Sequence, residues 1–90
     1  MTTEPDDLQE MLATRIKTLG TMLLEKYGEW LSDEQVGETL GVKAETVKRI
    51  PADLLPRIFG QRVRFWYEDV AIHVANKQME SVRRARLKRG

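Results

Sequence analysis

Three arginines surround one glycine in the stretch from residue 57 to residue 66, and this crowding is the chain's strongest chemical feature. Arg57, Arg62 and Arg64 are interleaved with apolar residues around Gly60. Like charges set close together on a short ribbon destabilise it. An anion lying across the ribbon reverses the sign of that interaction. The stretch therefore favours a polyanion, such as a nucleic-acid backbone, as its partner.

The spacing of this stretch predicts a β-hairpin with a two-residue turn at Gly60 and Gln61. Glycine first suits a type II′ turn, and the turn then sets the pairing of the strands. The expected pairs are Phe59–Arg62, Ile58–Val63 and Arg57–Arg64. Alternation directs Ile58, Val63 and Phe65 inward, and it directs Arg57, Phe59, Arg62 and Arg64 outward.

Phe59 has two interpretations at this point. If the register is right, it lies outward at the tip and can wedge or stack against a nucleotide. If the register is off by one residue, it belongs to the core.

A helix-turn-helix is predicted just before this ribbon. Ser32 and Gln35 form a capping box, so a helix begins at about Asp33. Gly41 can adopt the left-handed conformation that ends it, with Val42 buried in the turn. Gly37, unfavourable inside a helix, is explained by close approach of the second helix.

The second helix of the pair is expected from about Ala44 to Ile50, and Pro51 stops it. Val47 and Ile50 face inward. Two short helices joined by a tight glycine turn define the motif. The outward side chains are Lys43, Glu45, Thr46, Lys48 and Arg49.

Those outward residues suit a helix that enters the major groove of DNA. Lys48 or Arg49 can donate to guanine and Glu45 can accept from cytosine. Thr46 and Lys43 are better placed for phosphates. The alternative is a solvated helix face with a Glu45–Arg49 pair, which contributes only about 0.2–0.5 kcal/mol.

Length and composition limit the possibilities to one small domain of 90 residues. There is no cysteine, which excludes disulfides and thiolate metal sites and agrees with a cytoplasmic location. No uncharged run exceeds seven residues, so we expect no membrane span. The acidic start has the wrong sign for a signal or transit peptide.

The net charge of +1 conceals a strong polarity along the chain. Residues 1–42 carry nine acidic and three basic residues, whereas residues 43–90 carry twelve basic and five acidic ones. This asymmetry points to a polyanionic partner for the second half. Chance sorting of solvated charges is the alternative.

The first segment, from Asp6 to about Tyr27, has an apolar stripe at helical spacing. Gly20 is a weak point that can split it into two helices. The stripe can pack against the domain's own core or mediate self-association, since both bury the same face.

A last helix is expected from about Tyr67, with Glu68 and Asp69 in its first turn. The tail from residue 77 either extends this helix or stays loose until an anion orders it. Its candidate phosphate-neutralising residues are Arg83, Arg84, Arg86, Lys88 and Arg89. A solubilising end without a binding role is the alternative.

Catalysis is not expected. His73 is the single histidine, so no metal site can be completed around it, and no cofactor is indicated. Neither Ser32 nor Ser81 has a histidine placed for acyl transfer, and no glycine-rich phosphate loop is present.

The order of these elements resembles the excisionase and MerR-like winged helix-turn-helix family. The matching stretches are LSDEQVGETLGVKAETVKRI and LPRIFGQRVRFWYEDVAIHVA, which cover about residues 30–76. Two departures are Lys43, where a serine cap is usual, and Gly37 in place of alanine. The resemblance implies a mainly α fold with a two-stranded β wing, a winged helix-turn-helix with an added N-terminal helix.

The small size and basic tail look most like recombination directionality factors of phages and integrative mobile elements. That resemblance implies a protein that binds and bends double-stranded DNA and assists an integrase in excision. The expected organisation is an acidic helical segment at 1–29, a DNA-binding domain at 30–76 and a basic tail at 77–90. Self-association is expected either head to tail on DNA or through the N-terminal helix.

Two other functions remain open. The first is a small transcriptional regulator encoded by a phage or mobile element that uses the same DNA reader. The second is a protein-interaction module in which the N-terminal stripe grips a partner and the basic face is incidental.

Overall fold

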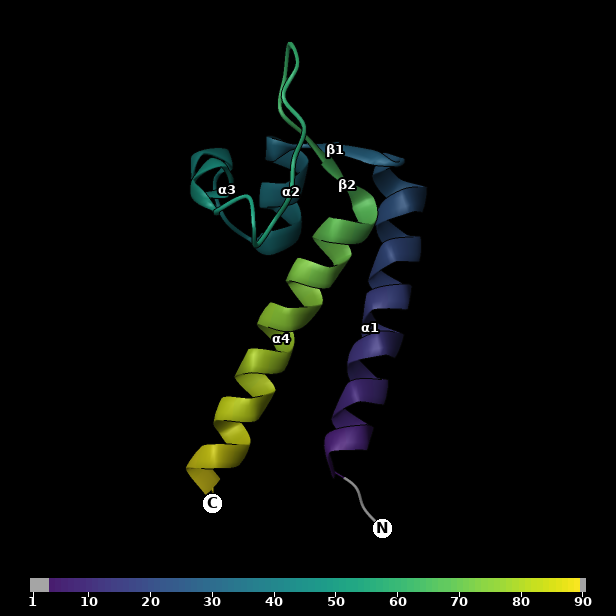
Figure 1. Cartoon of the computed structure of the whole chain (residues 1–90), viewed down its shortest axis with the longest axis vertical. Helices are drawn as coiled ribbons and strands as arrows, with labels where there is room; N and C mark the ends of the chain where they lie inside the picture. The colour runs from purple at the N-terminus through teal and green to yellow at the C-terminus, as the bar shows by residue number, and fades with distance from the viewer. Residues whose placement is uncertain (1–3, 90) are drawn as a thin grey trace.

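Two long helices and a small helix-turn-helix share one core (Figure 1). The computed structural model describes residues 4–89. In that part of the chain the elements are α1 (Glu4–Tyr27), β1 (Trp30–Ser32), α2 (Asp33–Leu40), α3 (Ala44–Arg49), β2 (Arg64–Trp66) and α4 (Tyr67–Arg89). The fold is mainly helical with one two-stranded antiparallel sheet, which confirms the expected fold class.

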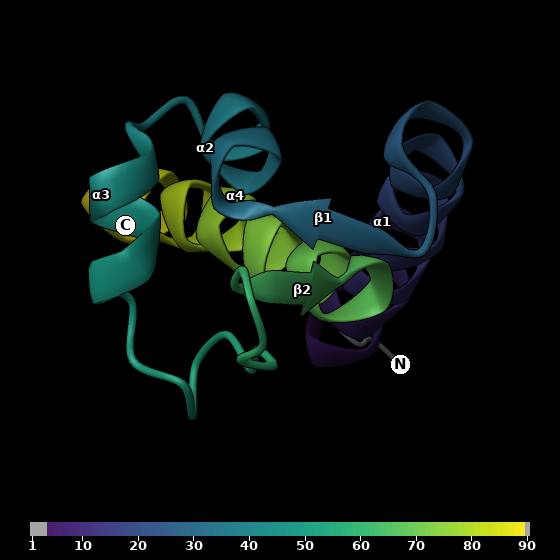
Figure 2. The ribbon, with the colours of Figure 1, turned by 90° about the horizontal axis from the view of Figure 1, so that it is seen from above.

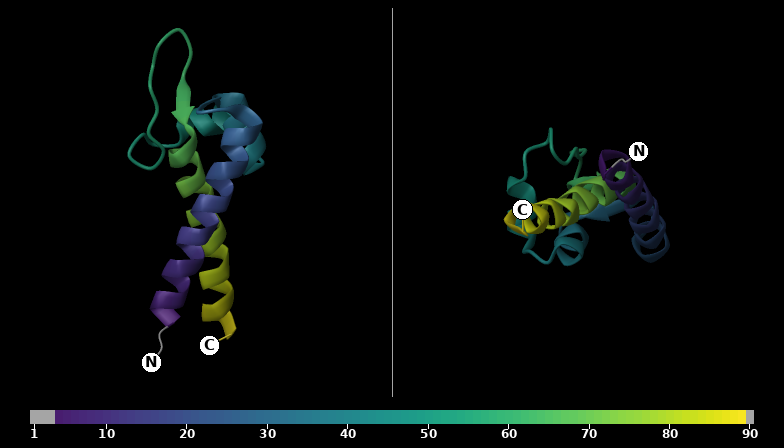
Figure 3. Two further views of the ribbon diagram at one scale, coloured as in Figure 1. Left: turned by 90° about the vertical axis from the view of Figure 1, so that its right-hand side faces the viewer. Right: turned by 90° about the horizontal axis from the view of Figure 1, so that it is seen from below.

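α1 is one continuous helix, and Gly20 does not divide it. Gly20 is buried where α1 crosses α4. A Cβ at this position would lie 3.8 Å from the ring of Tyr67 and 3.9 Å from the Cβ of Ala71. These are ordinary van der Waals distances, so an alanine at this position would also fit between the two helices. They run antiparallel, so the start of α1 and the end of α4 lie at the same end of the molecule (Figure 3).

The apolar stripe of α1 packs against the domain's own core. This was one of the two interpretations of the stripe; the other was self-association. Leu19 and Leu23 are buried in the same cluster as the core residues of the helix-turn-helix. The largest fully buried side chains of that cluster are Leu31, Val36, Val47, Leu55, Phe65 and Val70.

The α2–α3 pair forms as predicted. Ser32 accepts a hydrogen bond from the Gln35 N–H at 3.2 Å, and Gln35 Oε1 accepts one from the Ser32 N–H at 2.9 Å. Gly41 ends α2 in the left-handed region, with φ of 77°. Ile50 has extended geometry before Pro51, which ends α3.

Val42 is expected to be buried in the turn, but it is 40% exposed. The reason lies at Gly37, where the backbone of the turn occupies the space next to α2. A Cβ on Gly37 would lie 2.6 Å from the Val42 carbonyl oxygen. The close approach predicted for Gly37 is therefore present, but it involves the turn backbone, and the Val42 side chain is directed away from it.

The sheet pairs β1 with β2, which the sequence did not predict. Leu31 lies opposite Phe65 and Trp30 lies opposite Trp66. The two tryptophan rings pack edge to face, with centroids 5.0 Å apart. Seen from above, the sheet lies between α1 and the helix-turn-helix (Figure 2). The Tyr67 N–H also donates to the Glu29 carbonyl at 2.9 Å, which joins the start of α4 to the loop after α1.

α4 continues as a helix through Arg89, so the basic tail extends the last helix. His73 is almost fully buried on this helix. Within the described residues, none of the helices combines the length and the apolar character needed to cross a membrane.

Candidate nucleic-acid interface

α3 presents its polar side chains to solvent because one apolar residue anchors it. Val47 is fully buried, and Ile50 packs against the core from the end of the helix. The remaining faces are therefore turned outward. The five predicted residues, Lys43, Glu45, Thr46, Lys48 and Arg49, are all exposed.

The start of α3 is held by the backbone alone. Lys43 occupies the N-cap position and makes no side-chain capping bond. Its carbonyl accepts hydrogen bonds from the N–H groups of Thr46 and Val47, at 3.0 and 3.2 Å. The Lys43 side chain therefore stays exposed and is not used as a cap.

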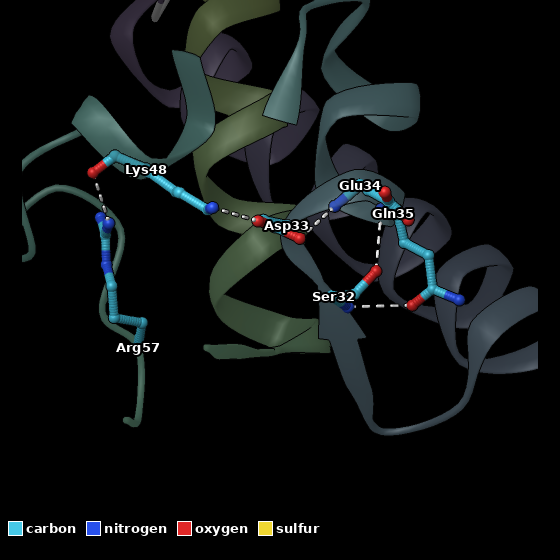
Figure 4. A network of polar contacts seen from close by, with 6 residues as sticks. All are labelled: Ser32, Asp33, Glu34, Gln35, Lys48 and Arg57. Atoms are coloured by element: carbon cyan, nitrogen blue, oxygen red, sulfur yellow. Dashed lines mark hydrogen bonds and ion pairs between the residues drawn. The ribbon is translucent and has the colours of Figure 1, made fainter. Parts of the chain in front are cut away.

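Lys48 is tied to the preceding helix. Its Nζ atom lies 3.3 Å from the Oδ2 atom of Asp33 (Figure 4). The other oxygen of Asp33 accepts a hydrogen bond from the Glu34 N–H at 2.8 Å. The same carboxylate thus supports the first turn of α2 and holds the Lys48 ammonium. The Lys48 side chain is still 56% exposed.

The wing, which we define as residues 58–64, projects from the rest of the molecule (Figures 1 and 3). Ile58 and Arg64 form an antiparallel bridge, with N–H to carbonyl distances of 2.9 and 3.0 Å in the two directions. Arg64 also pairs with Ser32 of β1. The base of the wing is therefore hydrogen bonded on both sides of β2.

This bridge corrects the predicted hairpin register. Ile58 lies opposite Arg64 and not opposite Val63, so five residues and not two form the connection. Gly60 does not have the positive φ of a type II′ turn; among the described residues, the glycines with positive φ are Gly28 and Gly41. Ile58, expected inside, is 50% exposed, whereas Phe65 is buried as predicted.

Arg57 does not face outward, and it does not lie opposite Arg64. Its guanidinium donates to the backbone carbonyls of Lys48, Leu55 and Ile50. It also lies over the ring of Phe65, 5.0 Å from the centroid. The guanidinium satisfies carbonyls in the last turn of α3 and in the segment that follows it, so Arg57 is held inward. We therefore assign Arg57 to the scaffold.

Phe59 remains at the tip of the wing despite the register shift, with 77% of its surface exposed. Gln61, Arg62 and Arg64 are exposed beside it. The wing thus presents one aromatic ring and two guanidinium groups to solvent.

The wing and α3 are brought together around an open hollow. Lys48 comes from α3, Gln61 and Arg62 come from the wing, and Asp33 and Glu34 come from the start of α2. Ser32 and Val63 complete the lining. The hollow therefore joins the two groups of candidate residues, but it carries two carboxylates next to its two cations.

Sequence reasoning missed Asp33 and Glu34 as part of this surface. Acidic residues in the first turn of a helix are fully explained by the helix dipole. The contact with Lys48 depends on how α3 lies across α2, and nothing in the local sequence reports that angle.

The tail residues are placed only in part. Arg84 is exposed on α4. The side chains of Arg83, Arg86, Lys88 and Arg89 lie outside the part that the structure describes. The backbone of these four residues belongs to the end of α4. Their contacts with phosphates remain a prediction from the sequence.

Two ionisable groups outside the interface have shifted pKa values. Burial lowers the pKa of His73 below its ordinary value of 6.5, and a hydrogen bond with the Leu54 backbone opposes that shift. Burial, followed by the charge of Glu68, raises the pKa of Asp69 above 3.8. Among the described residues, no group of three or more potential metal ligands is present.

Compared with protein-family models, with curated proteins and with solved structures, the chain matches none of them.

Proposed function

We propose that this protein binds double-stranded DNA through α3 and the wing. α3 enters the major groove, with Glu45, Lys48 and Arg49 directed at base edges. The wing lies along the adjacent minor groove, where Arg62 and Arg64 meet its negative potential.

One observation carries the proposal: the wing stands free of the body of the molecule beside an exposed α3. Gln61 and Arg62 at the wing and Lys48 on α3 line the same hollow. A wing folded back under its own helices would have left no such cationic surface. Phe59 adds to the argument, because an aromatic ring with 77% exposure is unfavourable in water unless a partner covers it.

We further propose that the protein acts as an accessory factor in excision of a mobile element. This narrower role rests on the resemblance to excisionases in the order of the elements. It requires an integrase as partner, bending of the bound DNA and a cytoplasmic location. Insertion of Phe59 between base steps provides one physical route to bending.

DNA binding can be tested by fluorescence anisotropy with a labelled duplex of mixed sequence. Phosphate contacts release counterions, so affinity must fall as salt rises. For about three to four contacts, we expect roughly a 100-fold loss between about 50 and about 200 mM salt. Selection from a randomised duplex pool would then give the preferred site.

The matched variants are Arg62→Glu and Lys26→Glu, which change the charge of the chain equally. Arg62 belongs to the wing, whereas Lys26 lies exposed in the last turn of α1. The proposal predicts a large loss of affinity for Arg62→Glu and a small one for Lys26→Glu. Equal losses would mean that binding follows net charge only, and no binding at low salt would reject the proposal.

A further inference from the structure

An open groove runs between α1 and α4, on a part of the surface that does not include α3 or the wing. Leu24 of α1 and Ile72 of α4 are 39% and 42% exposed on it. Trp66 and Tyr67 also line it. Apolar surface of this kind, with tryptophan and tyrosine beside it, is typical of a protein interface.

The floor of the groove is shallow because the two helices cross closely. Gly20 and Ala71 are both buried at the crossing, and a Cβ on Gly20 would lie only 3.9 Å from the Cβ of Ala71. Ala13 and Thr21 also line the groove with short side chains, and the longer side chains of Ile16 and Lys17 lie between Ala13 and Gly20. Another helix can therefore approach this face most closely at the crossing itself.

The charges on the rim are arranged at opposite ends. Lys17 precedes Gly20 by three residues, which is about 4.5 Å toward the start of α1. Glu68 and Asp69 precede Ala71 on α4, which runs antiparallel to α1. The two acidic residues and Lys17 therefore lie on opposite sides of the crossing, with the acidic residues on the side of the C-terminal end of α1.

Among the described residues, neither carboxylate has a cation within ion-pairing distance. Glu68 accepts a hydrogen bond from the Trp66 indole at 2.9 Å. Asp69 is half-buried next to Glu68. This end of the groove thus carries two adjacent negative charges that a cation from outside the chain would compensate.

We propose that the occupant of this groove is a second copy of the same chain, packed around a two-fold axis near the Gly20–Ala71 crossing. A two-fold axis that lies across the groove exchanges its ends, and an isologous interface uses the same patch on both copies. Lys17 of each copy then meets Glu68 and Asp69 of the other. Leu24 and Ile72 of both copies are buried between them.

Charge exchange provides the test, with sedimentation equilibrium of the full chain without DNA as the measurement. Lys17→Glu places acid against acid at both ends of the interface, and the joint replacement of Glu68 and Asp69 by lysine places base against base. Like charges brought together across an interface weaken association strongly. We expect each variant alone to dimerise at least about tenfold more weakly than the natural chain.

An equal mixture of the two variants should restore the dimer. In the mixed dimer, both rim contacts again join opposite charges, although each chain carries its charge reversal on only one of the two helices. The apolar part is tested with Leu24→Glu against Met22→Glu, since Met22 is exposed on α1 but does not line the groove. Leu24→Glu should abolish dimers, and Met22→Glu should leave them.

Three results would overturn the inference. The first is a monomer at all concentrations, the second is no recovery on mixing variants that remain folded by circular dichroism, and the third is growth into open chains. Open chains would indicate head-to-tail contacts, which join different surfaces. Because no DNA is present, none of these outcomes depends on the proposed DNA binding.

Discussion

Lys48 Nζ lies 3.3 Å from Asp33 Oδ2, so the helix proposed to read DNA is joined to the preceding helix through one of its own cations. The contact links α3 to α2, and it also lowers the positive charge available at the hollow shared with the wing. On binding, a phosphate or a base edge must compete with Asp33 for the ammonium. DNA affinity is therefore expected to depend on this pair.

Replacing Asp33 by asparagine should tighten DNA binding. Asp33→Asn keeps an oxygen that can accept the Glu34 N–H, but it removes one negative charge and frees Lys48. We expect the slope of log affinity against log salt to steepen by up to about one, the value of one phosphate contact. Anisotropy titrations over a range of salt measure it. Unchanged or weaker binding would show that Lys48 does not contact DNA.

Arg57 should matter for stability and not for DNA contacts. Arg57→Ala removes the donors that satisfy the carbonyls of Lys48, Ile50 and Leu55. We expect the free energy of unfolding to fall by about 2–3 kcal/mol, as measured by urea denaturation. Arg62→Ala, an exposed change on the wing, should alter it by less than about 0.5 kcal/mol. Similar values for the two variants would contradict the assignment of Arg57 to the scaffold.

Gly37 should not tolerate a methyl group. Alanine favours a helix by about 1 kcal/mol over glycine, but the added Cβ would lie 2.6 Å from the Val42 carbonyl oxygen. The turn must move, so we expect Gly37→Ala to reduce stability by about 1–2 kcal/mol. Gly60→Ala is the control, because its Cβ would meet open space. Equal thermal stability of both variants would contradict the close approach.

His73 should make the fold sensitive to mild acid. Its pKa is below 6.5 in the fold, mainly because of burial; Leu54 and Glu80 act in the raising direction, and Lys77 in the lowering direction. The unfolded chain therefore takes up the proton first as pH falls. The stabilisation that comes from keeping His73 neutral is present above about pH 6.5 and is lost as the pH falls below that value. Urea denaturation at pH 7.5 and pH 5 should show this loss, and His73→Gln should reduce it.

The helix-turn-helix could be predicted because its signals are local. The capping box at Ser32, the left-handed glycine at residue 41 and the proline at residue 51 each act within a few residues. All three are present where the sequence predicted them.

The remaining features depend on contacts between distant residues. β1 has only three residues, and it pairs with β2. The paired residues Trp30 and Trp66 are far apart in the sequence. Arg57 turns inward to backbone carbonyls, and Ile58 pairs with Arg64 at the base of the wing. In the sequence, Arg57 is only one more basic residue of the arginine-rich stretch. In the candidate interface, the exposed residues of α3 and the wing were predicted, but the contribution of Asp33 required the packing of α3 on α2.

The most direct test of the central claim is an NMR titration of the protein, labelled with nitrogen-15, with a short DNA duplex at low salt. The account predicts that the largest amide shift changes lie in residues 43–49 and 59–64, with α1 little affected. Changes centred on α1, or no changes at saturating duplex, would contradict the claim that α3 and the wing form a DNA-binding surface.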